Sequence, residues 1–257
     1  MALTYNQDSP SVLELKDVWL RIPIASTETR SLTKLFVRSV TGGNLKRSKR
    51  GAEIVALREI NCVIRHGERV ALLGHNGAGK STFLRLASGI YTPSQGYYQR
   101  NAEIFPLISK RFLTSPDLTG IDAAKAHYLH ANHSLRGFDK FLQDVVEFSG
   151  IGSFIELPVR GYSSGMGARL LFSLITSTAH DCLAIDEGLG AADSKFFDKA
   201  QERMNTFISS AGTLIFASHS HILLRKFCTR GLVFNQGCIV CDAPLEDAIK
   251  FYHAQNS

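Results

Sequence analysis

The chain has 257 residues, a formal net charge of +6 at pH 7, 44% hydrophobic residues and 20% charged residues. This length suits one large domain with a sizeable core, and the composition is ordinary for a soluble globular protein. The N-terminus lacks the basic start and apolar run of a signal peptide, and no apolar run reaches the roughly 20 residues of a membrane span. We therefore expect a cytosolic protein, which can still dock on a membrane protein.

The five cysteines predict free thiols rather than a disulfide framework, because the cytosol keeps thiols reduced. Cys238 and Cys241 form an isolated C-x-x-C within strand-like sequence, where residues three apart lie on opposite faces. That arrangement is poor for chelation, so a metal or redox role is the weaker interpretation.

Residues 12–20 alternate apolar and polar side chains and predict the first strand. A long basic connection follows at about residues 23–51, with a short amphipathic helix expected at 31–38. Two interpretations of its charge stay open, namely contact with lipid headgroups or a membrane partner, and a solvated loop. A nucleic-acid role is less favoured, because the loop lacks the repeated aromatic side chains that serve as stacking platforms.

Strands are next expected at residues 53–64 and 68–73, with a turn at 65–67. Between the second of these strands and a helix lies a segment that fits G-x-x-x-x-G-K-[S/T]. The nine residues that we expect to bind a nucleotide here are Gly74, His75, Asn76, Gly77, Ala78, Gly79, Lys80, Ser81 and Thr82. The glycines let successive backbone N–H groups point at one centre, and the positive end of the helix dipole also favours a polyphosphate there.

Within this motif, Lys80 is expected to neutralise the β- and γ-phosphates, and the Ser81 hydroxyl to bind Mg²⁺. The alternative is a glycine-rich turn that contains a lysine by chance. The order of strand, motif and helix disfavours that alternative, so the segment predicts a nucleotide-binding protein.

A turn at residues 91–96 and a strand at 97–108 are expected next, and the pattern becomes helical from about 109 to 160. Within this helical part, His127, His130 and His133 are spaced three apart, which suggests either a metal site or polar surface histidines. No carboxylate or cysteine accompanies them at ligand spacing, so the surface interpretation is favoured.

Two further motifs follow closely. Residues 162–166, Tyr-Ser-Ser-Gly-Met, open a helix, and a buried strand at 182–185 ends in Asp186 and Glu187. Carboxylates at the carboxyl end of such a strand lie where α/β proteins bind ligands. We expect Asp186 to hold Mg²⁺ and Glu187 to polarise the water that attacks the γ-phosphate. The alternative, a pair of loop carboxylates without function, is disfavoured by the nearby phosphate motif.

His219 follows another buried strand, residues 213–218. It is placed to hydrogen-bond the γ-phosphate, although many histidines at such positions merely cap a strand. A helix at about 222–228, two short strands and a last helix at about 244–253 complete the expected elements.

These motifs, in this order, resemble the nucleotide-binding subunit of an ABC transporter. The resemblance implies an α/β fold of the ABC type of P-loop NTPase, with a mixed sheet core, an antiparallel β edge and a helical subdomain at about 109–168, all within one domain that spans residues 1–257. The Tyr162–Met166 segment resembles the subfamily that exports O-antigen, capsule or teichoic acid, and so do residues 116–120 and 190–193.

The resemblance also implies how such a subunit works. ATP and Mg²⁺ would be bound between two copies of the chain in a homodimer, and hydrolysis would drive transport. The residues that one copy would contribute to its partner's ATP site are Ser163, Ser164, Gly165 and Met166. The other expected partners are a separate transmembrane permease in two copies and a lipid-linked polysaccharide as cargo, at the cytoplasmic face of the inner membrane, with no nucleic acid.

The chain departs from the family pattern at several positions. Gly167 stands where a basic residue is usual, and residues 109–110 lack the expected Gln or Glu. An adenine-stacking aromatic is expected on the first strand or just after it, and only Trp19 qualifies. The chain ends at Ser257, so we expect recognition of a polymer cap to be absent or done elsewhere. Three alternatives remain: an ABC ATPase for another cargo, a soluble ABC ATPase, and a regulatory subunit that binds ATP without hydrolysing it.

Overall fold

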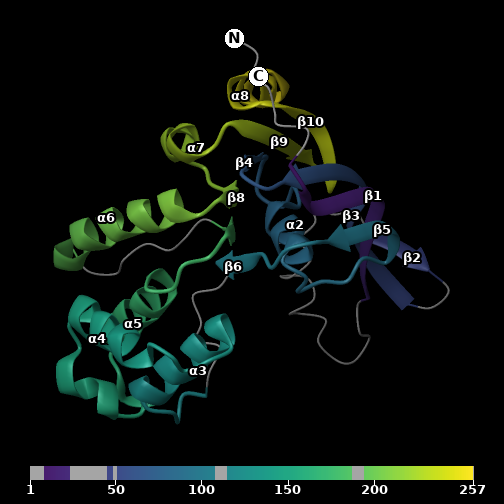
Figure 1. Cartoon of the computed structure of the whole chain (residues 1–257). Helices are drawn as coiled ribbons and strands as arrows, with labels where there is room; N and C mark the ends of the chain where they lie inside the picture. Colours follow the sequence, from purple (N-terminus) through teal and green to yellow (C-terminus); the bar gives the residue numbers. More distant parts are fainter. Residues whose placement is uncertain (1–8, 24–44, 49–50, 108–114, 187–193, 257) are drawn as a thin grey trace. The chain divides into compact units, whose positions relative to one another are not determined.

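The computed structural model describes residues 9–23, 45–48, 51–107, 115–186 and 194–256 (Figure 1). These residues form two compact units. The first draws on residues up to 108, 181–187 and 211–257, and the second on residues 109–180 and 188–210. The second unit therefore extends past residue 168, where the expected helical subdomain ends, and takes in a later segment as well.

The first unit contains an antiparallel four-stranded sheet in the order β2-β3-β1-β5. Its strands are β1 (Ser11–Pro23), β2 (Leu45–Ser48), β3 (Gly51–Arg65) and β5 (Gln95–Arg100). The expectation of one long connection at 23–51 is wrong at residues 45–48, because β2 pairs there with the start of β3 in the register Ser48↔Gly51. Residues 24–44, which hold most of that connection, lie outside the described part of the chain.

A six-stranded sheet forms the rest of the framework, in the order β10-β9-β4-β8-β7-β6. Its strands are β4 (Arg69–Leu73), β6 (Phe105–Leu107), β7 (Cys182–Ile185), β8 (Thr213–Ala217), β9 (Arg230–Asn235) and β10 (Cys238–Pro244). All neighbours are parallel except β9 and β10. Strands β7 and β8 are buried along their whole length, which explains their continuous apolar sequences.

Helix α2 (Lys80–Ala87) anchors the core of this unit. Its side chains Phe83, Leu84 and Leu86 are fully buried, and the Phe83 ring lies 5.2 Å from that of Phe234 in β9. One apolar cluster contains residues of α2 and of strands in both sheets. Helices α7 (His221–Phe227) and α8 (Leu245–Asn256) complete the unit. The start of α2 is therefore fixed against both sheets.

The second unit is helical. Its elements are α3 (Gly120–Asn132), α4 (Phe138–Ser149), the 3₁₀ turns η1 (Gly152–Glu156) and η2 (Val159–Gly161), α5 (Ser164–Thr176) and α6 (Ser194–Ser210). Thr119 and Asp122 form a capping box at the start of α3, and Phe141, Val145 and Leu170 lie in the core. None of the helices that the structure describes is long and apolar enough to cross a membrane.

Three local expectations differ from the structure. The strand expected at 97–108 is divided into β5 and β6. His127 is half-buried rather than a surface residue, and burial lowers its pKa to about 4. Cys238 and Cys241 pair with Asn235 and Val233, so a register shift in β10 places both cysteines on one face. Among the described residues, no group of three His, Cys, Asp or Glu side chains could hold a metal ion.

Candidate functional site

The phosphate motif forms the connection between β4 and α2, as the sequence predicts. Gly74 and Gly79 have φ values of +142° and +114°, which side chains other than glycine rarely adopt. A Cβ atom at Gly74 would lie 2.5 Å from the Phe234 carbonyl oxygen. The Gly237 N–H, in the turn between β9 and β10, donates to the Ala78 carbonyl at 2.9 Å. Neighbouring backbone therefore holds the loop in shape from outside.

Lys80 is the first residue of α2, and its side chain turns back over the loop. The ammonium group donates hydrogen bonds to the carbonyl oxygens of Gly74 and His75, the second at 3.1 Å. The positive charge is therefore held at the centre of the loop, where a phosphate would meet it.

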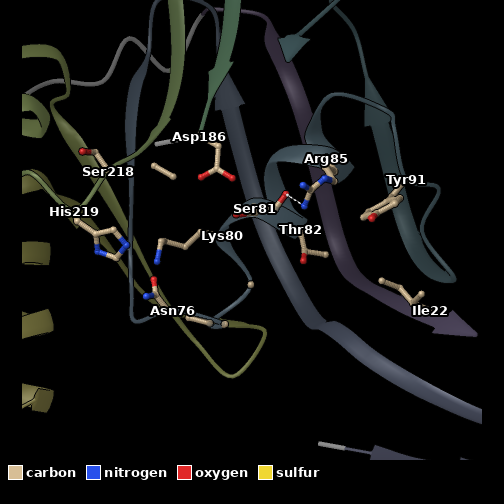
Figure 2. A pocket seen from close by; sticks show the side chains of 14 residues that line it. Ile22, Asn76, Lys80, Ser81, Thr82, Arg85, Tyr91, Asp186, Ser218 and His219 are labelled. Carbon is tan, nitrogen blue, oxygen red and sulfur yellow. Dashed lines mark hydrogen bonds between the residues drawn. The ribbon is translucent and has the colours of Figure 1, made fainter. Parts of the chain in front are cut away.

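A cavity of about 580 Å³ lies against this loop, entirely within the first unit (Figure 2). It brings together most of the residues predicted for the site, namely Asn76, Gly77, Ala78, Gly79, Lys80, Ser81, Thr82, Asp186 and His219. Gly74 and His75 do not line it. The His75 ring instead faces the Asn76 carbonyl at 2.9 Å and the Asn235 side-chain oxygen at 3.3 Å. Glu187 lies outside the described residues.

The two groups opposite Lys80 come from neighbouring parallel strands. Asp186 follows β7, and its N–H donates to the Leu107 carbonyl at 3.0 Å. His219 follows β8, and the preceding residue, Ser218, is buried. Because β4, β7 and β8 are parallel, their carboxyl ends meet at one edge of the sheet. An ammonium, a carboxylate, an imidazole and hydroxyl groups thus surround one cavity, which suits a polyphosphate with its cation.

Three further residues line the same cavity and were not predicted from the sequence, namely Ile22, Arg85 and Tyr91. Trp19, the aromatic that the sequence offered on the first strand, does not line it. Its indole N–H donates to the Asp17 carboxylate at 3.1 Å, and the Arg21 guanidinium lies 5.6 Å from its ring. An aromatic residue at Tyr91, four residues after the end of the motif's helix, was the available signal.

The Tyr-Ser-Ser-Gly-Met segment lies in the second unit, at the start of α5. Ser163 is the N-cap, and its hydroxyl oxygen accepts a hydrogen bond from the Met166 N–H at 3.2 Å. Ser163 and Ser164 are exposed, and a Cβ atom at Gly165 would meet nothing within 4 Å. This helix start therefore presents hydroxyl and backbone donors at the surface of its unit. Residues 109–110 and 190–193 lie outside the described part of the chain.

The family model described as "ABC transporter" matches residues 57–190, which include the phosphate motif, the Ser163 segment and Asp186. The chain belongs to the ABC transporter family. The cavity beside Lys80 is therefore the candidate nucleotide site of this ABC protein.

Relatives of this ABC protein include components of export systems. The O-antigen export system ATP-binding protein RfbE of Yersinia enterocolitica is 36% identical over 88% of the chain and 95% of its own length. The teichoic acids export ATP-binding protein TagH of Lactococcus lactis subsp. lactis is 33% identical over 86% of the chain, which spans only 46% of that longer relative. The solved dimeric structure of a bacterial ABC transporter cassette matches 91% of the chain and 98% of its own, with a TM-score of 0.62 and 18% identity. The predicted fold class is confirmed.

Proposed function

We propose that the chain is the ATP-hydrolysing subunit of an ABC transporter that exports a lipid-linked polysaccharide. The observation that carries the ATPase part is the cavity that gathers Lys80, Ser81, Asp186 and His219. The observation that supports the cargo is the 36% identity to an O-antigen export ATP-binding protein over nearly its whole length. The Tyr162–Met166 segment, which resembles the same subfamily, also supports the cargo.

The loop is built to hold the phosphates of ATP. Its N–H groups and the start of α2 favour negative charge, and Lys80 neutralises the β- and γ-phosphates. Ser81 and Asp186 line the same cavity and offer the oxygen ligands that Mg²⁺ prefers, so we propose that they hold this ion. When bound, Mg²⁺ neutralises charge that develops on the phosphate oxygens.

Phosphoryl transfer goes to water, so the site has to position a water molecule opposite the leaving group. We assign the role of general base to Glu187, next in sequence to Asp186, and a hydrogen bond with the γ-phosphate to His219. Glu187→Gln should then bind ATP and hydrolyse it at least about 100-fold more slowly, which a phosphate-release assay measures. Hydrolysis by this variant at the wild-type rate would remove Glu187 from the role.

The second half of each ATP site is proposed to come from another copy of the chain. Ser163 is exposed and Gly165 is half-buried at the start of α5, a 13-residue helix whose dipole favours an anion. A homodimer with ATP between the copies would place these donors on the γ-phosphate, and the similar solved cassette is dimeric. ATP binding and hydrolysis would close and open this dimer.

The transport step requires membrane-spanning partners. We propose two copies of a separate permease, with this subunit attached at the cytoplasmic face of the inner membrane, because the curated relatives are ATP-binding components of export systems. The closing and opening of the dimer would move the permease helices.

The test is made in the producing cell, by deleting the chain and comparing surface polysaccharide with polysaccharide on its lipid carrier inside. Loss from the surface with accumulation inside, restored by the wild type and not by Lys80→Ala, is the expected result. Lys250→Ala is the matched control, because Lys250 is exposed and does not line the cavity. An unchanged surface without internal accumulation would refute the polysaccharide assignment and leave the ATPase assignment standing.

A further inference from the structure

We propose that Tyr91 and Ile22 hold the base of the bound nucleotide, with the Tyr91 ring as the stacking surface. The proposal rests on the ATP-binding part of the proposed function. It assigns the aromatic platform to the turn after α2, because the first strand supplies no aromatic side chain to the cavity.

The position of the two side chains within the cavity is the first support. Lys80, Asp186 and His219 lie at one end, and Ile22 and Tyr91 lie at the other, with Thr82 and Arg85 between them (Figure 2). Since Lys80 and the loop fix the phosphates at the first end, the sugar and base of a nucleotide extend toward the second. The cavity of about 580 Å³ falls in the ordinary size range of small-molecule sites.

The chemistry of the second end fits a base rather than further phosphate. Ile22 and Tyr91 are half-buried and pack against the main apolar cluster, so each also keeps surface that faces the cavity. A base has apolar faces and stacks on aromatic side chains without strong preference for its identity. The flat ring of Tyr91 and the aliphatic side chain of Ile22 supply such contacts from two different elements.

Both side chains are held in place before any ligand arrives. The N–H groups of Ile90 and Tyr91 donate to the Arg85 carbonyl at 2.9 and 3.2 Å, which ties the turn to the last part of α2. Ile22 pairs with Ile54 in the ladder between β1 and β3. Side chains on a fixed backbone lose little conformational freedom on binding, so they favour affinity.

The aromatic on the first strand is engaged elsewhere. Trp19 pairs with Gln95 across to β5, and its indole N–H and ring are occupied by Asp17 and Arg21. Strand β1 has register shifts on both sides of Val18, so Ile22, and not Trp19, reaches the cavity.

The experiment compares ligands with and without a base on the full chain with Mg²⁺, by isothermal titration calorimetry with ADP and with tripolyphosphate. Tyr91→Ala should weaken ADP binding about 5- to 150-fold, the range found for loss of one aromatic–base stack, and should change tripolyphosphate binding less than about twofold. Tyr91→Phe keeps the ring and should bind ADP within about twofold of the wild type. Tyr97→Ala, an exposed tyrosine outside the cavity, is the control and should bind both ligands normally.

Each other outcome overturns the proposal. Equal weakening of both ligands by Tyr91→Ala would mean that Tyr91 only supports the phosphate loop, and no weakening of either would mean that the base lies elsewhere. Loss of ADP affinity in Trp19→Ala, with none in Tyr91→Ala, would return the role to the first strand. If the wild-type chain binds neither ligand, the ATP-binding part of the proposed function is refuted as well. If the wild-type chain binds both ligands, but a strain that lacks the chain still exports polysaccharide normally, only the cargo assignment is refuted.

Discussion

Arg230 ties together four segments of the nucleotide-binding unit, and its removal should be costly. The guanidinium donates to the Glu68 carboxylate and to the Val63 carbonyl, both at 2.9 Å, and makes two bonds with Asp242 at 2.7 and 2.6 Å. The side chains of Arg230 and Glu68 are both only 12% exposed. Burial disfavours the charged form of Arg230. The hydrogen bonds to Asp242, together with the negative charges of Asp242 and Glu68, nevertheless hold the pKa of Arg230 above its usual range.

Arg230→Ala leaves the Glu68 carboxylate buried without this cation, which costs about 3–5 kcal/mol of unfolding free energy in comparable buried pairs. Adding Glu68→Gln removes the stranded charge, so the double variant should recover about 1 kcal/mol or more. Urea unfolding followed by the fluorescence of Trp19, the one tryptophan, measures both. The matched control is Arg225→Ala, whose pair with Glu246 is 49% and 56% exposed and should contribute far less, because solvent screens exposed charges. A loss below about 1 kcal/mol for Arg230→Ala would refute this reasoning.

Gly74→Ala should abolish tripolyphosphate binding in calorimetry, because its Cβ would lie 2.5 Å from the Phe234 carbonyl. Gly161→Ala, with nothing within 4 Å and no positive φ, should bind normally. The hydrogen bond from Arg203 is the main cause that lowers the pKa of Asp144 in the folded chain. Its stabilisation is therefore complete above the unfolded pKa of about 3.9 and is lost as the pH falls through the lower folded value. The stability difference between wild type and Asp144→Asn should thus be constant from pH 7 to 5 and shrink below pH 4, and a constant difference down to the most acidic measurable pH would contradict this. Burial raises the pKa of three thiols to about 12, those of Cys62, Cys182 and Cys228. Ellman's reagent at pH 8 should accordingly react with at most two thiols in the folded chain and with all five in urea.

The phosphate-binding end of the site could be read from the sequence, and the other end could not. Lys80, Asp186 and His219 each follow a short apolar strand, so a local pattern gives both the residue and its place at the carboxyl edge of a sheet. Tyr91 and Ile22 meet only through tertiary packing. The register of β1 shifts at several points and Asp17 has a φ of +48°, so simple alternation along that strand could not say which side chain faces the cavity.

The same limit applies to the edges of the fold. Strand β2 has four residues and is formed by pairing with β3, a partner that single-sequence periodicity does not reveal. The mixed sheet with its antiparallel edge was expected from the resemblance to the ABC family, whereas the continuous apolar runs predicted only its individual buried strands. Helix α6 was not predicted from the sequence, and its place in the helical unit depends on tertiary contact, because it follows Asp186 in the chain and joins α5 only in space.

The contacts that shape the phosphate loop determine when the site is completed during synthesis. His75 meets Asn235 across 160 residues of sequence, and Ala78 accepts its hydrogen bond from Gly237. At about 5–20 residues per second, a ribosome needs roughly 8–32 s to reach these supports after it has made the motif. A nascent chain in that interval carries the whole nucleotide motif without the hairpin that holds it. On the proposed function, ATP would therefore stabilise the finished protein more than its early folding intermediates.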